Sequence, residues 1–322
     1  MACRTLSLHI QGSRGPSTHT ALKRQGTFNP LSSQGDDTQG SDAGGWSRAG
    51  RNLHFGVREG AMGAILDGMA AHGGYVPFGS TFFIFSAYLR PAIRLAALMG
   101  LHVLHVFTYD SMAVGEDGPT HQPVEQLASL RAIPNITLIR PADANETAVA
   151  RKVAIETRDR PVLLVLTRQG LPTLDRSRHA SAEGLRKGAY VVRELNTAGA
   201  SENALSDPRS SPNAGAPDLI LLVSGSELSL VLSAAERLQA QGLWVRCVSM
   251  PSWDLFEAQP RAYRDEVLPP TVPARLAVEL GPCRAGTAMW ATAVMCSASK
   301  VSARRHLQAF CCANSASRLT RW

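Results

Sequence analysis

The chain has 322 residues, of which 44% are hydrophobic and 18% charged, a length and composition that suit two soluble globular domains. No apolar run approaches the roughly 18 residues of a membrane span, and the first residues lack the apolar core of a secretory signal, so we expect a cytoplasmic protein with no membrane partner. Of the net charge of +7, six basic residues fall in 281–322, which leaves 27 Lys and Arg against 26 Asp and Glu in 1–280. A nearly neutral body of this kind argues against nucleic acid as a partner.

The first part of the chain changes in character near residue 51. Residues 1–50 are rich in Gly, Ser, Thr and Asp and show little periodicity, which predicts an irregular leading segment. In 51–185, helical patterns alternate with short apolar runs, which predicts parallel βαβ units in one α/β domain. The expected helices are 58–73, 86–100, 123–133 and 144–158, and the expected strands lie within 75–85, 102–110, 136–143 and 161–168.

A second α/β unit is expected after a break. Residues 186–217 contain many Pro, Gly and Ser residues, which predicts a linker or surface insertion. In 218–280 we expect strands at 218–224, 243–252 and 274–280 and a helix at 228–242. Residues 281–322 form a basic tail with no acidic residue and four of the six cysteines, at spacings that fit neither a zinc site nor a disulfide framework.

The stretch "GEDGPTHQPVEQ" (115–126) is the strongest candidate for a functional loop. It follows a buried strand, and loops at the carboxyl ends of parallel strands hold the ligands of open α/β sheets. Asp117 and His121 could orient a substrate hydroxyl and move a proton. A plain helix start explains the same residues, with Thr120 as N-cap, Pro123 in the first turn and Glu125 complementing the helix dipole.

Other candidates have equally plain alternatives. Glu59 stands where a strand passes into a helix, a place that favours acidic residues in any case. Phe82, Phe85 and Tyr88 recur every three residues, as core residues commonly do. Arg168 directly follows an apolar strand and could bind a phosphate or make an ion pair. Neither a P-loop nor a G-x-G-x-x-G motif occurs in the sequence.

Together these stretches resemble the transketolase family. The similarity is carried by "RNLHFGVREGAMGAI", "STFFIFSAYLRPAIRLAALM", "YDSMAVGEDGPTHQPVEQLASLRAIPNITLIRPAD" and "VLLVLTRQGLP", and it covers about residues 12–280. It implies a parallel-sheet pyrimidine-binding domain of a thiamine diphosphate enzyme, followed by a truncated second α/β domain that shapes the dimer. The implied activity is transfer of a two-carbon ketol unit from a ketose phosphate to an aldose phosphate, in the pentose phosphate pathway.

The resemblance also implies roles for individual residues. Glu59 would hydrogen-bond the aminopyrimidine ring of thiamine diphosphate and assist catalysis, and the aromatic residues Phe82, Phe85 and Tyr88 would grip that ring. The residues implied at the sugar phosphate are Ser17, Tyr109, Asp117, His121 and Arg168. In this set Asp117 and His121 would bind sugar hydroxyls, His121 would assist proton transfer, and Arg168 would bind the phosphate.

The sequence departs from the family in several places. It contains no counterpart of the amino-terminal domain whose G-D-G…N motif binds the cofactor's diphosphate and Mg²⁺, so we expect no metal ligands in this chain. "IQGSRGPSTHT" lacks a family aspartate, a family histidine falls on Tyr109, and a bulky position is Gly60. After Glu279 the resemblance stops, which suggests a frame error or a damaged gene end, and residues 1–11 invite the same interpretation.

Three hypotheses follow. The chain could be a transketolase, as a homodimer or with a partner chain that supplies the diphosphate-binding domain. It could instead be an inactive transketolase fragment that keeps only the fold and a dimerisation surface. Nucleic-acid binding by the basic tail is the weakest, because the tail lacks interleaved aromatic residues.

Overall fold

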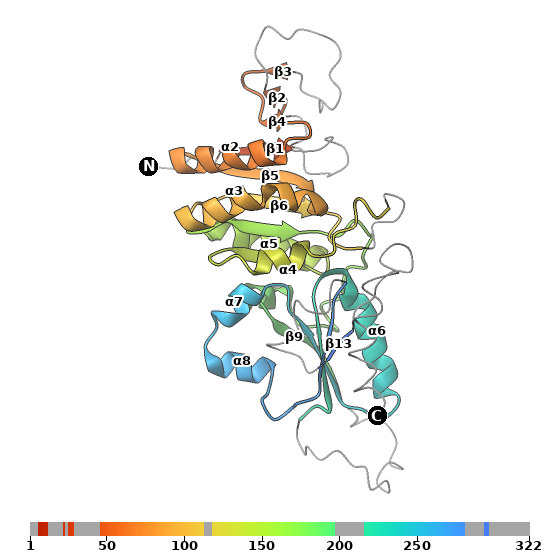
Figure 1. Ribbon diagram of the computed structural model, residues 1–322. Coiled ribbons are helices and arrows are strands. Elements are labelled where there is room, and N and C mark those ends of the chain that lie inside the picture. Colours follow the sequence, from red (N-terminus) through yellow and green to blue (C-terminus); the bar gives the residue numbers. More distant parts are fainter. Residues whose placement is uncertain are drawn as a thin grey trace, which may run out of the picture. The chain divides into compact units, whose positions relative to one another are not determined.

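The computed structural model describes residues 6–11, 22, 25–28, 46–112, 118–196, 216–280 and 293–295 (Figure 1). The chain divides into two compact units. The first comprises residues 1–139 and 151–168, and the second comprises residues 140–150 and 169–322. Both contain a β-sheet flanked by helices, so the predicted α/β class is confirmed.

An eight-stranded sheet, in which every neighbouring pair is parallel, forms the centre of the first unit. Across the sheet the strands are β3 (Trp46–Ser47), β2 (Thr27–Phe28), β4 (Asn52–His54), β1 (Leu6–Gln11), β5 (Tyr75–Phe82), β6 (Leu104–Thr108), β8 (Val162–Val165) and β7 (Thr137–Ile139). All four residues of β8 are buried, as expected for a strand of a parallel sheet that is covered on both faces.

Among the described residues, three α-helices and part of a fourth belong to the first unit. They are α2 (Glu59–His72), α3 (Ser86–Met99), α4 (Gln126–Arg131) and residues 151–156 of α5 (Ala144–Glu156). In α3, Leu89, Ile93 and Ala96 repeat at helical spacing and are fully buried. α2 packs against α3 and β5 (Figure 1). The buried apolar side chains of α2 and α3 share one core cluster with Phe107 and Leu163.

The second unit contains a five-stranded mixed sheet. Its strands are, in order, β13 (Ala293–Met295), β12 (Arg275–Val278), β10 (Leu219–Val223), β11 (Val245–Ser249) and β9 (Tyr190–Leu195). Only β9 runs antiparallel to its neighbour. This unit also contains the 3-10 helices η3 (Ala182–Lys187) and η5 (Gly225–Glu227) and the α-helices α6 (Leu228–Gln239), α7 (Trp253–Glu257) and α8 (Arg261–Val267).

A buried ion pair stabilises the second unit. The Arg140 side chain is 0% exposed, and its Nη2 lies 2.8 Å from Glu227 Oε2. Its Nη1 donates to Glu227 Oε1 at 3.0 Å and to the Ser224 carbonyl oxygen at 2.9 Å. Removal of one partner from such a pair costs about 3–5 kcal/mol, because a buried charge then loses its counterion.

Five of the described strands lie where the sequence predicted no regular structure. The leading segment 1–50 was expected to be irregular, yet β1, β2 and β3 all belong to the first sheet. The expected linker 186–217 includes β9, whose residues pair with β11. The tail includes β13, which pairs parallel with β12. β2, β3 and β13 are only two or three residues long, so their pairing rather than local periodicity determines them, whereas β1 does alternate apolar and polar residues. Within the described residues, no helix is long and apolar enough to span a membrane.

Candidate functional site

Three neighbouring strands of the first unit each lead into a predicted site residue. β5 ends at Phe82, β6 is followed by Tyr109, and Arg168 lies shortly after β8. Because β5, β6 and β8 are parallel neighbours, their carboxyl ends lie along the same edge of the sheet. That edge is where open α/β sheets bind ligands.

Phe82, Phe85 and Tyr88 form a continuous aromatic stripe at this edge. They come from the end of β5, the short helix η1 (Phe83–Phe85) and the first turn of α3. The Phe82 and Phe85 ring centroids are 6.1 Å apart and nearly parallel, and those of Phe85 and Tyr88 are 6.3 Å apart. Phe83 instead packs in the core with 0% exposure, whereas Tyr88 is 66% exposed. The stripe is therefore separate from the core, although its spacing would have suited core residues.

Tyr109 has a backbone conformation that few non-glycine residues adopt. Its φ is +63°, in the left-handed region, where a tyrosine is strained by roughly 1–2 kcal/mol. The Tyr109 ring centroid lies 4.1 Å from the Phe82 ring centroid. The Arg168 Cζ lies 5.5 Å from the same Tyr109 ring centroid. Strain of this kind is retained where surrounding contacts impose it, and such positions concentrate at functional sites.

His121 adds an imidazole to the aromatic stripe. Its ring centroid is 5.6 Å from Phe85 and 6.2 Å from Phe82, both in edge-on arrangements. Nδ1 lies 2.9 Å from Thr120 Oγ1, so a hydrogen bond to the neighbouring hydroxyl orients the ring. The prediction that Thr120 caps a helix was wrong, because α4 begins only at Gln126 and its N-cap is Glu125. Residues 118–125 thus form a loop that carries His121 to the stripe.

Glu59 is the first residue of α2 and is buried, with 5% exposure. Burial raises the pKa of its carboxyl group, and a backbone hydrogen bond partly offsets that effect. Oε1 is buried and has no hydrogen-bond partner among the described residues. A Cβ added to Gly60 would lie 3.5 Å from the Tyr88 carbonyl oxygen, so the start of α2 lies beside the aromatic stripe. The orphaned oxygen is therefore a hydrogen-bonding position suited to a polar ligand.

Two of the expected site residues, Ser17 and Asp117, lie outside the described residues. The described part of the chain has no group of three or more His, Cys, Asp or Glu side chains that could hold a metal ion.

The arrangement offers three kinds of chemistry along one edge: aromatic faces for a flat ring, an imidazole for proton transfer, and a guanidinium for an anion. Sequence reasoning found these residues but missed two features of their geometry. The left-handed Tyr109 carries no sequence signal, since Gly, Asn or Asp would be the usual residue there. The closeness of Gly60 to Tyr88 depends on how α2 packs against α3, and a glycine alone does not reveal it.

Two family models match the chain. The model described as "Transketolase, pyrimidine binding domain" matches residues 8–173. The model described as "Transketolase-like TK C-terminal domain" matches residues 209–304. The second match corrects the expectation that the resemblance ends after Glu279, because it continues into the tail and includes β13.

Individual relatives agree with the family models. A transketolase of Geobacillus stearothermophilus is 59% identical over 235 residues, which are 73% of this chain and 33% of that protein. The chain thus spans about a third of the length of the curated relatives it matches. A crystal structure of the Pichia stipitis transketolase, in complex with sedoheptulose-7-phosphate, has a TM-score of 0.75 at 36% identity and covers 91% of this chain and 38% of its own.

A shorter structure shares the fold alone. It is described as a split-gene transketolase in an inactive β4 tetramer, and it has a TM-score of 0.58 at 22% identity. The match covers 84% of this chain and 81% of that one.

Proposed function

Because the chain belongs to the transketolase family, we propose that it supplies the aminopyrimidine-binding half of a thiamine diphosphate site and acts only with a partner that supplies the diphosphate half. The reaction would be transfer of a two-carbon ketol unit from a ketose phosphate to an aldose phosphate. The bound cofactor would provide the electron sink for breaking and remaking the carbon–carbon bond beside the ketone.

The Glu59 carboxyl group is the observation that carries this proposal. Its Oε1 is buried without a hydrogen-bond partner among the described residues, and burial raises its pKa, which favours a protonated carboxyl group able to share a proton. A ring nitrogen of an aminopyrimidine can accept a hydrogen bond from such a protonated carboxyl group. Glu59 would hold a proton at that nitrogen and orient the ring against the neighbouring stripe.

The aromatic stripe would bind the flat pyrimidine. Phe82, Phe85 and Tyr88 lie along one side of the site, and Tyr88 exposes 66% of its surface, enough for a ring to cover it. Stacking of aromatic rings contributes about 0.5–1.5 kcal/mol per pair beyond the burial of surface. Loss of one stripe residue should therefore weaken cofactor binding without disturbing the core.

The remaining site residues would bind the sugar phosphate. The Arg168 guanidinium is held over Tyr109 and is the chemical match for a phosphate group. His121 would donate to, or take a proton from, a sugar hydroxyl, with its ring oriented by Thr120. Ser17 and Asp117 complete the expected substrate set. Support for a phosphorylated sugar comes from the Pichia stipitis relative, which was crystallised with sedoheptulose-7-phosphate.

The proposed partner is a second chain with a diphosphate- and Mg²⁺-binding domain, and the assembly would include a dimer of this chain. The two matched family models describe the pyrimidine-binding domain and the C-terminal domain, and neither describes a diphosphate-binding domain. A protein described as a split-gene transketolase shares this fold, and its β4 tetramer is described as inactive.

The test is reconstitution. Thiamine diphosphate and Mg²⁺ are titrated calorimetrically into the full chain, alone and mixed with a transketolase diphosphate-binding domain, and ketol transfer is assayed in both. We expect tight binding and turnover only in the mixture. Glu59→Gln should lower turnover in the mixture by about 100-fold or more, the usual contribution of a general acid or base.

Glu266→Gln is the matched control, because Glu266 is an exposed glutamate on α8 of the second unit. It should leave binding and turnover unchanged. If the mixture neither binds the cofactor nor turns over, the chain is the inactive family member of the alternative hypothesis. Turnover by Glu59→Gln at the unsubstituted rate would refute the role given to that carboxyl group.

A further inference from the structure

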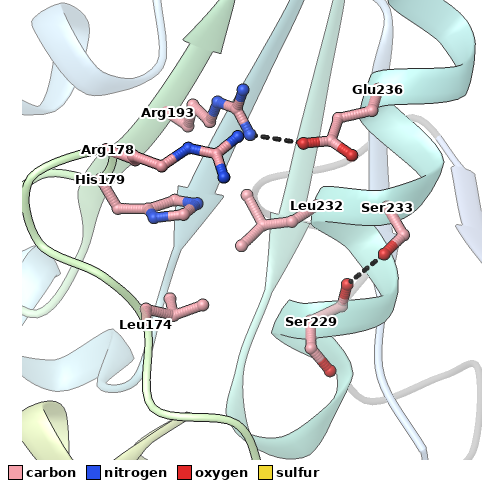
Figure 2. Close-up of a pocket in the computed structure, with 8 residues that line it drawn as sticks. All are labelled: Leu174, Arg178, His179, Arg193, Ser229, Leu232, Ser233 and Glu236. Carbon is pink, nitrogen blue, oxygen red and sulfur yellow. Dashed lines mark hydrogen bonds and ion pairs between the residues drawn. The ribbon is translucent and has the colours of Figure 1, made fainter.

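A small cavity in the second unit lies outside the site described above. Its volume is about 170 Å³, room for several water molecules. The lining residues come from the 174–179 loop, from β9 and from α6 (Figure 2). They are Leu174, Arg178, His179, Arg193, Ser229, Leu232, Ser233 and Glu236.

Basic groups outnumber acidic ones in this cavity. Arg178, His179 and Arg193 point toward α6 in Figure 2, and Glu236 is the one carboxylate among the lining residues. Arg193 Nη1 lies 2.6 Å from Glu236 Oε1, so that carboxylate is already paired. Arg178 and His179 both interact electrostatically with the exposed Asp175 carboxylate. Within the described part of the chain, the Arg178 guanidinium makes no side-chain hydrogen bond or ion pair. Among the lining residues the two guanidinium groups outnumber the single carboxylate, and an anion would neutralise that difference.

The loop that carries two of these groups is anchored from behind. Asp143 Oδ2 accepts hydrogen bonds from the Leu174 backbone N–H at 3.0 Å and from Arg176 Nη2 at 2.8 Å. The His179 Nδ1 is 2.9 Å from the Asp175 carbonyl oxygen. A carbonyl only accepts, so Nδ1–H donates, which leaves Nε2 to accept from the O–H of a monoprotonated phosphate or, in an imidazolium, to donate to a phosphate oxygen. Such anchoring positions Arg178 and His179 before binding and lowers the entropy lost when a ligand arrives.

α6 completes the lining with neutral hydrogen-bonding groups. Ser229 and Ser233 are one helical turn apart, and the Ser233 hydroxyl is 3.1 Å from the Ser229 carbonyl oxygen. Ser229 is the second residue of α6, at the positive end of the helix dipole. Leu232, 6% exposed, forms an apolar wall between the two serines. Guanidinium groups, an imidazole and the Ser229 hydroxyl around one small space suit an oxyanion with several acceptor oxygens, whereas the Ser233 hydroxyl already donates to the Ser229 carbonyl oxygen.

We propose that this cavity binds the phosphate group of a small phosphomonoester. A phosphate offers two negative charges and three terminal oxygens, enough to engage Arg178, Arg193 and His179 together. Arg178 and Ser233 are exposed, so the cavity opens to solvent and the organic part of the ligand can remain outside. The site is independent of the proposed ketol transfer, because none of its residues belongs to the first unit.

Titration of the full chain with inorganic phosphate, and separately with sedoheptulose-7-phosphate, tests the proposal by calorimetry. Arg178→Ala should weaken phosphate binding by about tenfold, the effect of losing one charged hydrogen-bonding partner. Glu236→Gln should strengthen binding several-fold, because it releases Arg193. Arg237→Ala removes one positive charge from α6, as Arg178→Ala does from the loop, but leaves the cavity lining intact, so the Kd of phosphate should stay unchanged.

A further variant separates this cavity from the proposed substrate site. Arg168→Ala should leave the binding of inorganic phosphate at the cavity intact, and circular dichroism checks that each variant is folded. Stronger binding of the sugar phosphate than of inorganic phosphate in Arg168→Ala identifies the phosphomonoester as the ligand of the cavity, and equal binding identifies free phosphate. Absence of saturable binding at about 10 mM ligand, or equal losses in Arg178→Ala and Arg237→Ala, would overturn the proposal.

Discussion

The Arg168 Cζ lies 5.5 Å from the centre of the Tyr109 ring, although the two residues follow different strands and are far apart in the sequence. The contact holds a guanidinium over an aromatic face, a cation–π arrangement worth about 0.5–2 kcal/mol. It also ties Arg168 to the aromatic stripe, since the Tyr109 ring packs at 4.1 Å on Phe82. The proposed phosphate-binding and pyrimidine-binding groups therefore form one connected layer.

Replacement of Arg168 should discriminate between phosphorylated and unphosphorylated substrates. In the reconstituted mixture, Arg168→Ala should raise KM for a ketose phosphate by about 10- to 100-fold, because a charged hydrogen bond contributes about 1.5–3 kcal/mol. The kcat should change far less. A ketose without phosphate provides the internal control, and an equal rise in its KM would show that Arg168 acts by supporting the fold instead.

Tyr88 should matter for cofactor binding and hardly at all for stability. Its side chain is 66% exposed, so Tyr88→Ala should change the free energy of unfolding by no more than about 0.5 kcal/mol. The Kd of thiamine diphosphate in the mixture should rise by about tenfold, as the stacked ring is lost. Leu98, on the same helix and 71% exposed, is the matched control, and Leu98→Ala should leave the Kd unchanged.

Asp67 on α2 should make the chain less stable as the pH rises. Its side chain is 5% exposed, neither oxygen has a hydrogen-bond partner among the described residues, and burial raises its pKa from 3.8 to about 6. The folded state therefore binds a proton more tightly than the unfolded state does. Its contribution is most favourable below pH 4 and is lost as the pH rises to about 6.

Asp67→Asn removes this dependence. Urea unfolding should show the variant more stable than the unsubstituted chain by about 2 kcal/mol at pH 8, with the difference vanishing near pH 4. Asp265→Asn is the control, because Asp265 lies on the exposed side of α8 in an ion pair with Arg261 and should alter stability by no more than about 0.5 kcal/mol. A pH-independent difference for Asp67→Asn would contradict the account.

Two glycines with left-handed backbones allow strain and crowding to be separated. Gly188 has a φ of +84° and Gly242 a φ of +86°, so alanine is strained by about 1 kcal/mol at either position. A Cβ on Gly188 would overlap the backbone of Phe256 and Ser252, whereas a Cβ on Gly242 meets nothing within 4 Å. We expect Gly188→Ala to cost about 3 kcal/mol or more and Gly242→Ala only about 1 kcal/mol, measured by urea unfolding. Equal losses would mean that the Phe256 segment moves aside freely.

Much of the fold could be predicted from local sequence pattern. The apolar runs "VLLV" and "LILLV" form β8 and β10. The helical spacing of 86–100 corresponds to α3, which begins at Ser86. Such patterns work because a strand or helix buried in a sheet must be apolar at a fixed period. The glycines and the proline that precede His121 likewise predicted the short loop that carries it.

Other parts of the fold had no local signal. β9 mixes charged and apolar residues, and it forms because its backbone pairs antiparallel with β11 at the sheet edge. That pairing places Arg193 opposite Cys247 and beside Glu236 of α6, which assembles the phosphate cavity from three separate segments. No spacing in the sequence connects Arg178, Arg193 and Ser233, because strand order and helix packing bring them together.

The sequence by itself determined the family, the alternating elements and the residue types of the candidate site, because those depend on local pattern and composition. Only the tertiary structure decided how these residues meet. Parallel pairing of β5, β6 and β8 aligns Phe82, Tyr109 and Arg168 at one edge, and packing around Tyr109 imposes a left-handed backbone that a tyrosine alone would avoid. Burial at the start of α2 likewise leaves Glu59 Oε1 without a hydrogen-bond partner in the part of the chain that the structure describes, and that burial arises from contacts between segments distant in the chain.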